Sequence, residues 1–136
     1  MPHEPITRQR IDELLRYLPL FEAPDREFFD KWSGGEKTSD GTVTMPYPVY
    51  LPDVEEFFRL AGQPCWCDYD YDPVQAGRML ADEQLIRQAS MAQVRTMLTY
   101  CVRGERFCDG LWGAVLGSGR VQALLRRLRE LREEIT

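Results

Sequence analysis

The chain of 136 residues contains a single histidine, His3, close to its first residue. A serine or cysteine nucleophile normally uses a histidine as its general base, and zinc enzymes normally use histidine ligands. Histidine-based catalysis is therefore effectively excluded, and we expect the protein not to be an enzyme. Any catalysis would have to depend on carboxylate, arginine or cysteine side chains.

The sequence also lacks long apolar runs, a signal peptide and a phosphate-binding motif. Its longest apolar run, LWGAVLG, is too short to cross a bilayer, and MPHEPITRQR lacks the apolar core of a signal peptide. GSGR at 117–120 has too few residues of a phosphate-binding loop. We therefore expect a cytoplasmic protein with reduced thiols and no cofactor.

The composition is ordinary for one soluble domain, with 43% hydrophobic and 29% charged residues. The net charge of −5 is unevenly distributed. Residues 1–72 carry 7 basic and 15 acidic side chains, and residues 73–136 carry 10 and 7. Such a division predicts attraction between the two halves or between one half and a partner.

Helical periodicity dominates the chain, apart from a proline-containing stretch at 35–52 that we expect to be a long surface loop, with room for a brief strand near Val43. No strand pair is convincing. We predict an all-α fold, a compact single-domain bundle of about seven short helices over residues 1–136. The expected helical segments are 7–18, 24–32, 53–62, 72–81, 82–89, 90–102, 108–117 and 119–134.

Three helix starts carry capping signals. Ser90 and Gln93 form a capping box, and Asp72 is followed by Pro73 at the first helical position. Asp53 would cap a third helix, with Glu56 reaching back to it.

Cysteines and aspartates provide two weak metal-site alternatives to the prediction that no metal is bound. Cys65, Cys67, Cys101 and Cys108 have intervening spacings of one and six residues rather than the two typical of zinc sites. Asp68, Asp70 and Asp72 alternate as in the first half of a calcium loop, but the second half of the pattern is missing. Free thiols and solvated or capping carboxylates are the preferred interpretations.

The C-terminal helix is amphipathic. Its apolar stripe predicts burial or pairing with the same helix of a second copy. Interleaved glutamates and the absence of aromatic residues on this helix argue against nucleic-acid binding by its arginines. The stripe comprises Val121, Leu124, Leu125, Leu128 and Leu131, and the arginines are Arg120, Arg126, Arg127, Arg129 and Arg132.

The stretch CVRGERFCDGLWG, residues 101–113, is the main candidate site. Because buried corners require paired charges, we expect Arg103 and Arg106 to pair with Glu105 and Asp109. The alternative is a binding site for a phosphate or carboxylate, formed by both arginines, with the Trp112 ring as a stacking surface. Asp109 argues against an anion at that helix start.

Most of the chain outside 35–52 resembles a family of small uncharacterised bacterial proteins with a domain of unknown function. The resemblance is carried by LLRYLPLFE, by DYD, and by LTYCVRGERFCDGLWGAVLGSGRVQALLRRLREL. In that family the residue before Trp112 is commonly a histidine, whereas here it is Leu111. The resemblance implies a bacterial protein and brings no activity, cofactor or partner.

We therefore predict a non-catalytic interaction or regulatory module that binds a protein partner or self-associates through its C-terminal helix. The alternative is a binder of a small anionic ligand or nucleotide, conceivably an enzyme, that uses Arg103 and Arg106.

Overall fold

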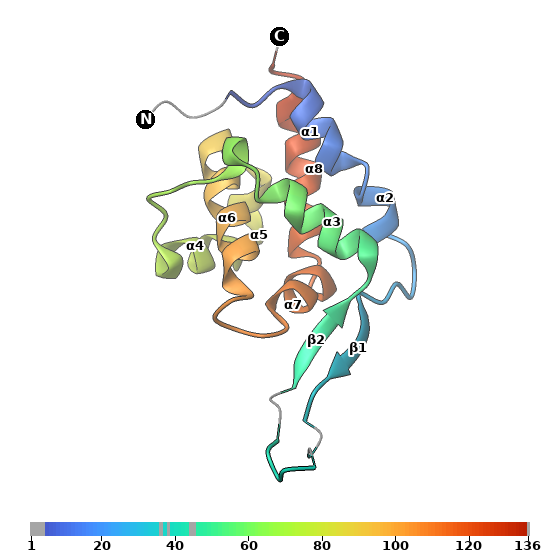
Figure 1. Ribbon diagram of the computed structural model, residues 1–136. Coiled ribbons are helices and arrows are strands. Elements are labelled where there is room, and N and C mark those ends of the chain that lie inside the picture. Colours follow the sequence, from blue (N-terminus) through green and yellow to red (C-terminus); the bar gives the residue numbers. More distant parts are fainter. Residues whose placement is uncertain (1–4, 36, 38, 44–45, 136) are drawn as a thin grey trace.

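A computed structural model describes residues 5–35, 37, 39–43 and 46–135. The protein is a mainly helical body from which a two-stranded ribbon projects (Figure 1). The mainly helical fold is confirmed. Among the described residues, no helix is both long and apolar enough to cross a membrane. His3 lies outside the described residues.

The helices are short. Their bounds are α1 Arg8–Leu15, α2 Leu18–Phe21, α3 Pro52–Ala61, α4 Pro73–Leu80, α5 Glu83–Arg87, α6 Met91–Gly104, α7 Leu111–Gly117 and α8 Arg120–Arg132, with a 3₁₀ turn at Pro64–Trp66. The ribbon lies between α2 and α3 in the sequence.

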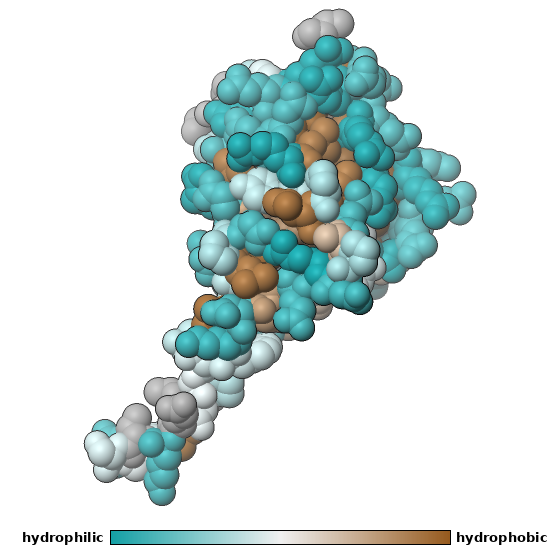
Figure 2. Space-filling view, turned by 90° about the vertical axis from the view of Figure 1, so that its right-hand side faces the viewer, coloured by the Kyte–Doolittle hydropathy of each residue, from teal (hydrophilic) through white to brown (hydrophobic). Residues whose placement is uncertain are grey.

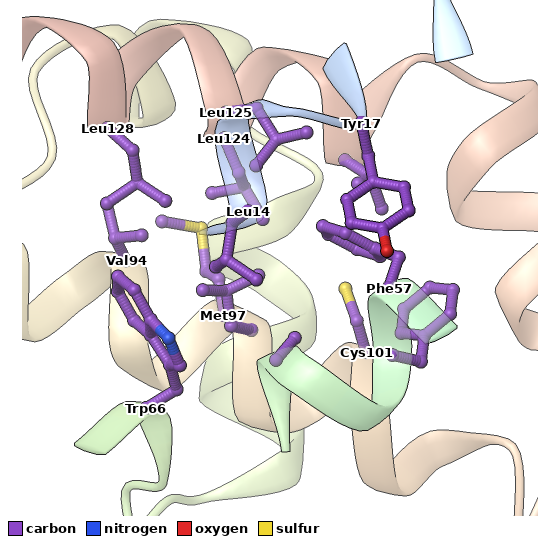
Figure 3. Packing of buried hydrophobic residues seen from close by; sticks show 14 of the residues in the cluster. Leu14, Tyr17, Phe57, Trp66, Val94, Met97, Cys101, Leu124, Leu125 and Leu128 are labelled. Carbon is purple, nitrogen blue, oxygen red and sulfur yellow. The ribbon is translucent and has the colours of Figure 1, made fainter. Parts of the chain in front are cut away.

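The core lies where α8 meets α1, α5, α6 and α7. Figure 3 shows Leu124, Leu125 and Leu128 of α8 facing Val94 and Met97 of α6, all of them fully buried. Trp66 closes one side of this cluster. The apolar stripe of α8 is therefore used inside the chain, and no leucine face remains on this helix for pairing with a second copy.

Two of the three predicted helix caps are confirmed. The Asp72 carboxylate accepts from the backbone N–H groups of Val74 and Gln75, and Ser90 forms a capping box with Gln93. The prediction that Asp53 caps α3 is wrong. This helix begins one residue earlier at Pro52, and Asp53 instead forms a two-pronged ion pair with Arg26.

The predicted helix at 24–32 is wrong, and part of the predicted loop at 35–52 forms a strand. β1 (Phe29–Ser33) pairs antiparallel with β2 (Tyr47–Tyr50), with an irregularity between Phe29 and Lys31. Farther out, Lys37 bridges Val43. Residues 36, 38, 44 and 45 of the predicted loop lie outside the described residues. The spacing of Phe28, Phe29 and Trp32 fits either a helix or a bulged strand, so it misled the prediction.

Charges on α8 link the two halves of the chain. Arg132 Nε lies 2.6 Å from Asp12 Oδ1, and Arg126 Nε lies 3.2 Å from Glu22 Oε2. The Arg132 hydrogen bond lowers the pKa of Asp12. The basic C-terminal half thus binds acids of the N-terminal half, as the uneven charge distribution predicts.

Candidate functional site: the α6–α7 corner and the ribbon base

Glu105 is the central residue of the corner between α6 and α7. Its Oε1 accepts hydrogen bonds from the Tyr50 hydroxyl at 2.7 Å and from the Trp112 backbone N–H at 2.9 Å. Its Oε2 accepts from the Gly110 N–H at 2.8 Å. A glutamate at the end of one helix therefore satisfies amides at the start of the next, where the helix dipole favours negative charge.

Gly110 is the backbone hinge of this corner. Its φ of 93° lies in the left-handed region, which an L side chain rarely adopts. This conformation turns the 105–110 loop so that its N–H and that of Trp112 both reach Glu105. The sequence places glycine at the position where the turn requires it.

Trp112 fixes the corner to the helical body. Its indole Nε1–H donates to the carbonyl of Cys101 at 3.0 Å, near the end of α6. Its ring stacks on Phe58 of α3, with the ring centres 4.4 Å apart and the planes 8° apart. Because both its polar and its apolar parts have partners, Trp112 is a structural anchor of α7.

The ribbon base packs directly on the corner. Phe29 lies so close to Gly113 that a Cβ there would be 2.2 Å from the Phe29 ring. Trp32 lies over Gly110, where a Cβ would be in ordinary contact with the Trp32 ring at 3.4 Å. The absence of a side chain at Gly113 is therefore what allows β1 to sit against α7.

A continuous run of aromatic rings connects the ribbon with the core. Phe29 stacks on Trp32 and on Tyr50, with ring centres 5.7 and 4.9 Å apart. Tyr50 then contacts Trp112 at 5.2 Å. Burial, followed by the hydrogen bond to Glu105, raises the pKa of the Tyr50 hydroxyl, which therefore stays protonated as the donor.

The expected pairing of the corner arginines with the corner acids is not found. Within the described part of the chain, no ion pair joins Arg103 or Arg106 to Glu105 or Asp109. Glu105 binds Tyr50 and backbone amides instead. Sequence reasoning identified the acid but could not foresee a partner 55 residues away.

The two arginines do not converge on a common ligand seat. Arg103 lies over the rings of Tyr69 and Tyr71, with its guanidinium carbon 5.9 and 5.5 Å from their centres. Arg106 lines an open hollow of about 460 Å³ beside Phe58 and Trp112, and Arg103 is not part of its lining. Glu55 and Glu105 also line this hollow and offset the charges of Arg59 and Arg106.

The four cysteines that we considered as a weak metal-site alternative lie in different environments in the structure. Cys65 and Cys101 are buried and Cys108 is exposed, while Cys67 donates its thiol to the Gly62 carbonyl. Burial raises the pKa of the Cys101 thiol to about 12.

The aspartates likewise have local partners. Asp68 accepts hydrogen bonds from the Thr96 hydroxyl and the Asp70 backbone N–H, and Asp72 caps α4. Across the ranges that the structure describes, no three His, Cys, Asp or Glu side chains are grouped so that they could hold a metal ion.

The ribbon exposes aromatic side chains that sequence reasoning did not select. Trp32 is 52% exposed and Tyr47 is 50% exposed, although both are large and apolar. Phe107, in the same loop as Gly110, is 84% exposed. The available signal in the sequence was the group Tyr47, Val49 and Tyr50, residue types that favour a strand, although Pro46 and Pro48 argue against one.

The chain belongs to a family of unknown function (DUF6508), whose model matches residues 6–134. No curated protein matches the chain. No solved structure matches it either. The family membership confirms the predicted resemblance and carries no activity with it.

Proposed function

We propose that this family member is a non-catalytic interaction module, and that the β1–β2 ribbon is the arm with which it binds a partner protein. The observation that carries the proposal is the exposure of Trp32 and Tyr47 on an element that projects from the body (Figure 2). Trp and Tyr are the side chains most enriched at the energetic centres of protein interfaces.

The two faces of the ribbon each offer one of these rings. Trp32 is paired with Pro48 across the ribbon, and the next pair outward is Ser33 with Tyr47. Because successive side chains alternate between the faces of a strand, Trp32 and Tyr47 lie on opposite faces. An arm with an aromatic ring on each face suits insertion into a groove of a partner.

The edge of β2 is a poor template for an added strand, because Pro46 and Pro48 have no N–H to donate. Recognition by the ribbon therefore relies on side chains. The run of rings from Trp32 to Trp112 supports the arm at its base, and a prepositioned arm loses less entropy on binding.

The other predicted modes of binding have less support. Self-association through α8 would need its leucine stripe, which is buried in the core. A small anion held jointly by Arg103 and Arg106 would need side chains that face one hollow, and only Arg106 lines it.

The proposal is tested by photo-crosslinking in cells that naturally produce the protein. A photoreactive amino acid replaces Trp32 in one variant and Val74 of α4, which is 65% exposed, in a control variant. We expect a discrete protein adduct from position 32 that position 74 does not give. Identical adducts from both positions, or none from position 32, would contradict the proposal.

A further inference from the structure

Apart from the ribbon, the protein has a charged surface in a groove between α5 and α8. This groove has a volume of about 560 Å³, the largest of the hollows described for this chain. Five arginines line it: Arg87, Arg120, Arg126, Arg127 and Arg129. Only two acids, Glu83 and Glu130, lie in the same wall. The groove therefore has an excess of three positive charges on a protein whose net charge is −5.

The internal partners of these arginines do not neutralise the groove. Arg126 pairs with Glu22 at 3.2 Å, and the Arg127 Nε–H donates to the Ala89 carbonyl at 2.8 Å. Within the described residues, the side chains of Arg87 and Arg129 form no hydrogen bond or ion pair. Even with Glu22 counted against Arg126, an excess of two positive charges remains.

Arg120 has an incompletely satisfied guanidinium at one end of the groove. Its Nη1 is buried and lies 3.4 Å from Glu83 Oε1, a distance that gives attraction, but no acceptor forms a hydrogen bond with it. Burying a donor without an acceptor costs about 1–3 kcal/mol. Arg120 therefore adds positive charge to this end of the groove without being fully satisfied within the chain.

We propose that the groove binds an extended acidic segment of a partner protein. Arg120 and Arg129 are nine residues apart on α8, which corresponds to about 13 Å along the helix axis. An extended chain with regularly spaced carboxylates can contact arginines distributed over that length. Guanidinium groups are suited to such a ligand because they bind carboxylates in a two-pronged fashion.

Nucleic acid fits the same groove less well. No aromatic residue lines it, so a base would find no ring on which to stack. The net charge of −5 also disfavours the approach of a long polyanion to the rest of the surface. The partner segment proposed here uses a different surface from the ribbon and does not depend on the ribbon being an arm.

The test uses the full chain and a fluorescein-labelled hexaglutamate peptide, with fluorescence anisotropy as the readout. Arg87→Glu/Arg129→Glu removes the two unpartnered groove arginines. Arg16→Glu/Arg78→Glu changes the net charge equally at exposed arginines outside the groove lining. We expect the groove variant to weaken binding at least about tenfold and the control less than about threefold. Binding that both variants weaken equally, or no binding by the native chain, would overturn the proposal.

Two further ligands test whether the groove binds a small anion or a nucleic acid instead of an acidic peptide segment. We expect inorganic phosphate to compete with the peptide only in large excess, and hexathymidylate to bind more weakly than hexaglutamate. Competition by phosphate at the same concentration as the peptide would identify a small-anion site. Tighter binding of the oligonucleotide, lost in the groove variant, would identify a nucleic-acid site. Either result would overturn the acidic-segment proposal.

Discussion

Tyr50 donates a 2.7 Å hydrogen bond to Glu105, and this contact joins the base of the ribbon to the turn between α6 and α7. The same carboxylate accepts two backbone N–H groups of that turn. One side chain therefore holds together a turn and a strand that are far apart in the sequence. The stability of the fold and the position of the arm should both depend on it.

Glu105→Gln is expected to lower the free energy of unfolding by about 1–3 kcal/mol, because an amide has one acceptor oxygen where the carboxylate has two. Asp109→Asn, four residues later in the same turn, is the matched control and should have little effect. Urea unfolding of both variants provides the measurement. Equal losses for the two would contradict the central place given to Glu105.

Tyr50→Phe should couple with Glu105→Gln. If the hydroxyl and the carboxylate act through one hydrogen bond, the double variant loses less stability than the two single variants together, by about 0.5–3 kcal/mol. A double-mutant cycle in urea measures the difference directly. Strict additivity would mean that the 2.7 Å contact contributes nothing to stability.

Gly113→Ala should destabilise the protein, whereas Gly117→Ala in the same helix should not. A Cβ at position 113 would lie 2.2 Å from Phe29, but at position 117 it would meet nothing within 4 Å. We expect a loss of about 1–3 kcal/mol for the first and a gain of up to about 1 kcal/mol for the second. Thermal unfolding compares them, and Phe29→Leu should restore part of the loss. Similar effects at both glycines would show that the ribbon does not pack on α7.

Alkaline pH should destabilise the protein partly through Cys101. Its pKa is raised from 9.0 to about 12 by burial, so the folded state keeps the thiol proton where the unfolded state releases it. The stabilising effect is complete below about pH 9 and is lost as the pH rises towards 12, with a slope of about 1.4 kcal/mol per pH unit.

The measurement is the free energy of unfolding from pH 8 to pH 11. Cys101→Ala should show a shallower decline than the native chain, and Cys108→Ala, at an exposed thiol, should show an unchanged one. The Tyr50 hydroxyl contributes to the decline in all three proteins, so the comparison isolates the thiol. An equal slope in native chain and Cys101→Ala would contradict the buried, protonated state.

Local signals predicted the helices well and long-range contacts poorly. Ser90 with Gln93, and Asp72 before Pro73, mark helix starts because their partners lie within three residues. Asp53 has the same pattern, but Pro52 begins α3 and Arg26 takes the carboxylate. An aspartate at a helix start can either cap that helix or form an ion pair with a distant residue, and the tertiary structure determines which interaction forms.

The ribbon and the site depended on contacts that no local pattern contains. Pro46 and Pro48 argued against a strand, yet a two-stranded ribbon has a free outer edge where missing N–H groups are tolerated. At the corner, the spacing of charges in 103–109 suggested mutual pairing. In the structure, the Tyr50 hydroxyl and the backbone amides of Gly110 and Trp112 donate to Glu105 instead, because the turn brings these groups together.

The most direct test of the ribbon as a binding arm is the affinity of the crosslinked partner, purified and titrated calorimetrically. Trp32→Ala/Tyr47→Ala removes the two exposed rings, and Val74→Ala removes an exposed apolar side chain on the body. We predict at least about a tenfold loss of affinity for the ribbon variant and native affinity for the control, with both variants folded at the temperature of the titration. Native affinity without the two rings would contradict the account.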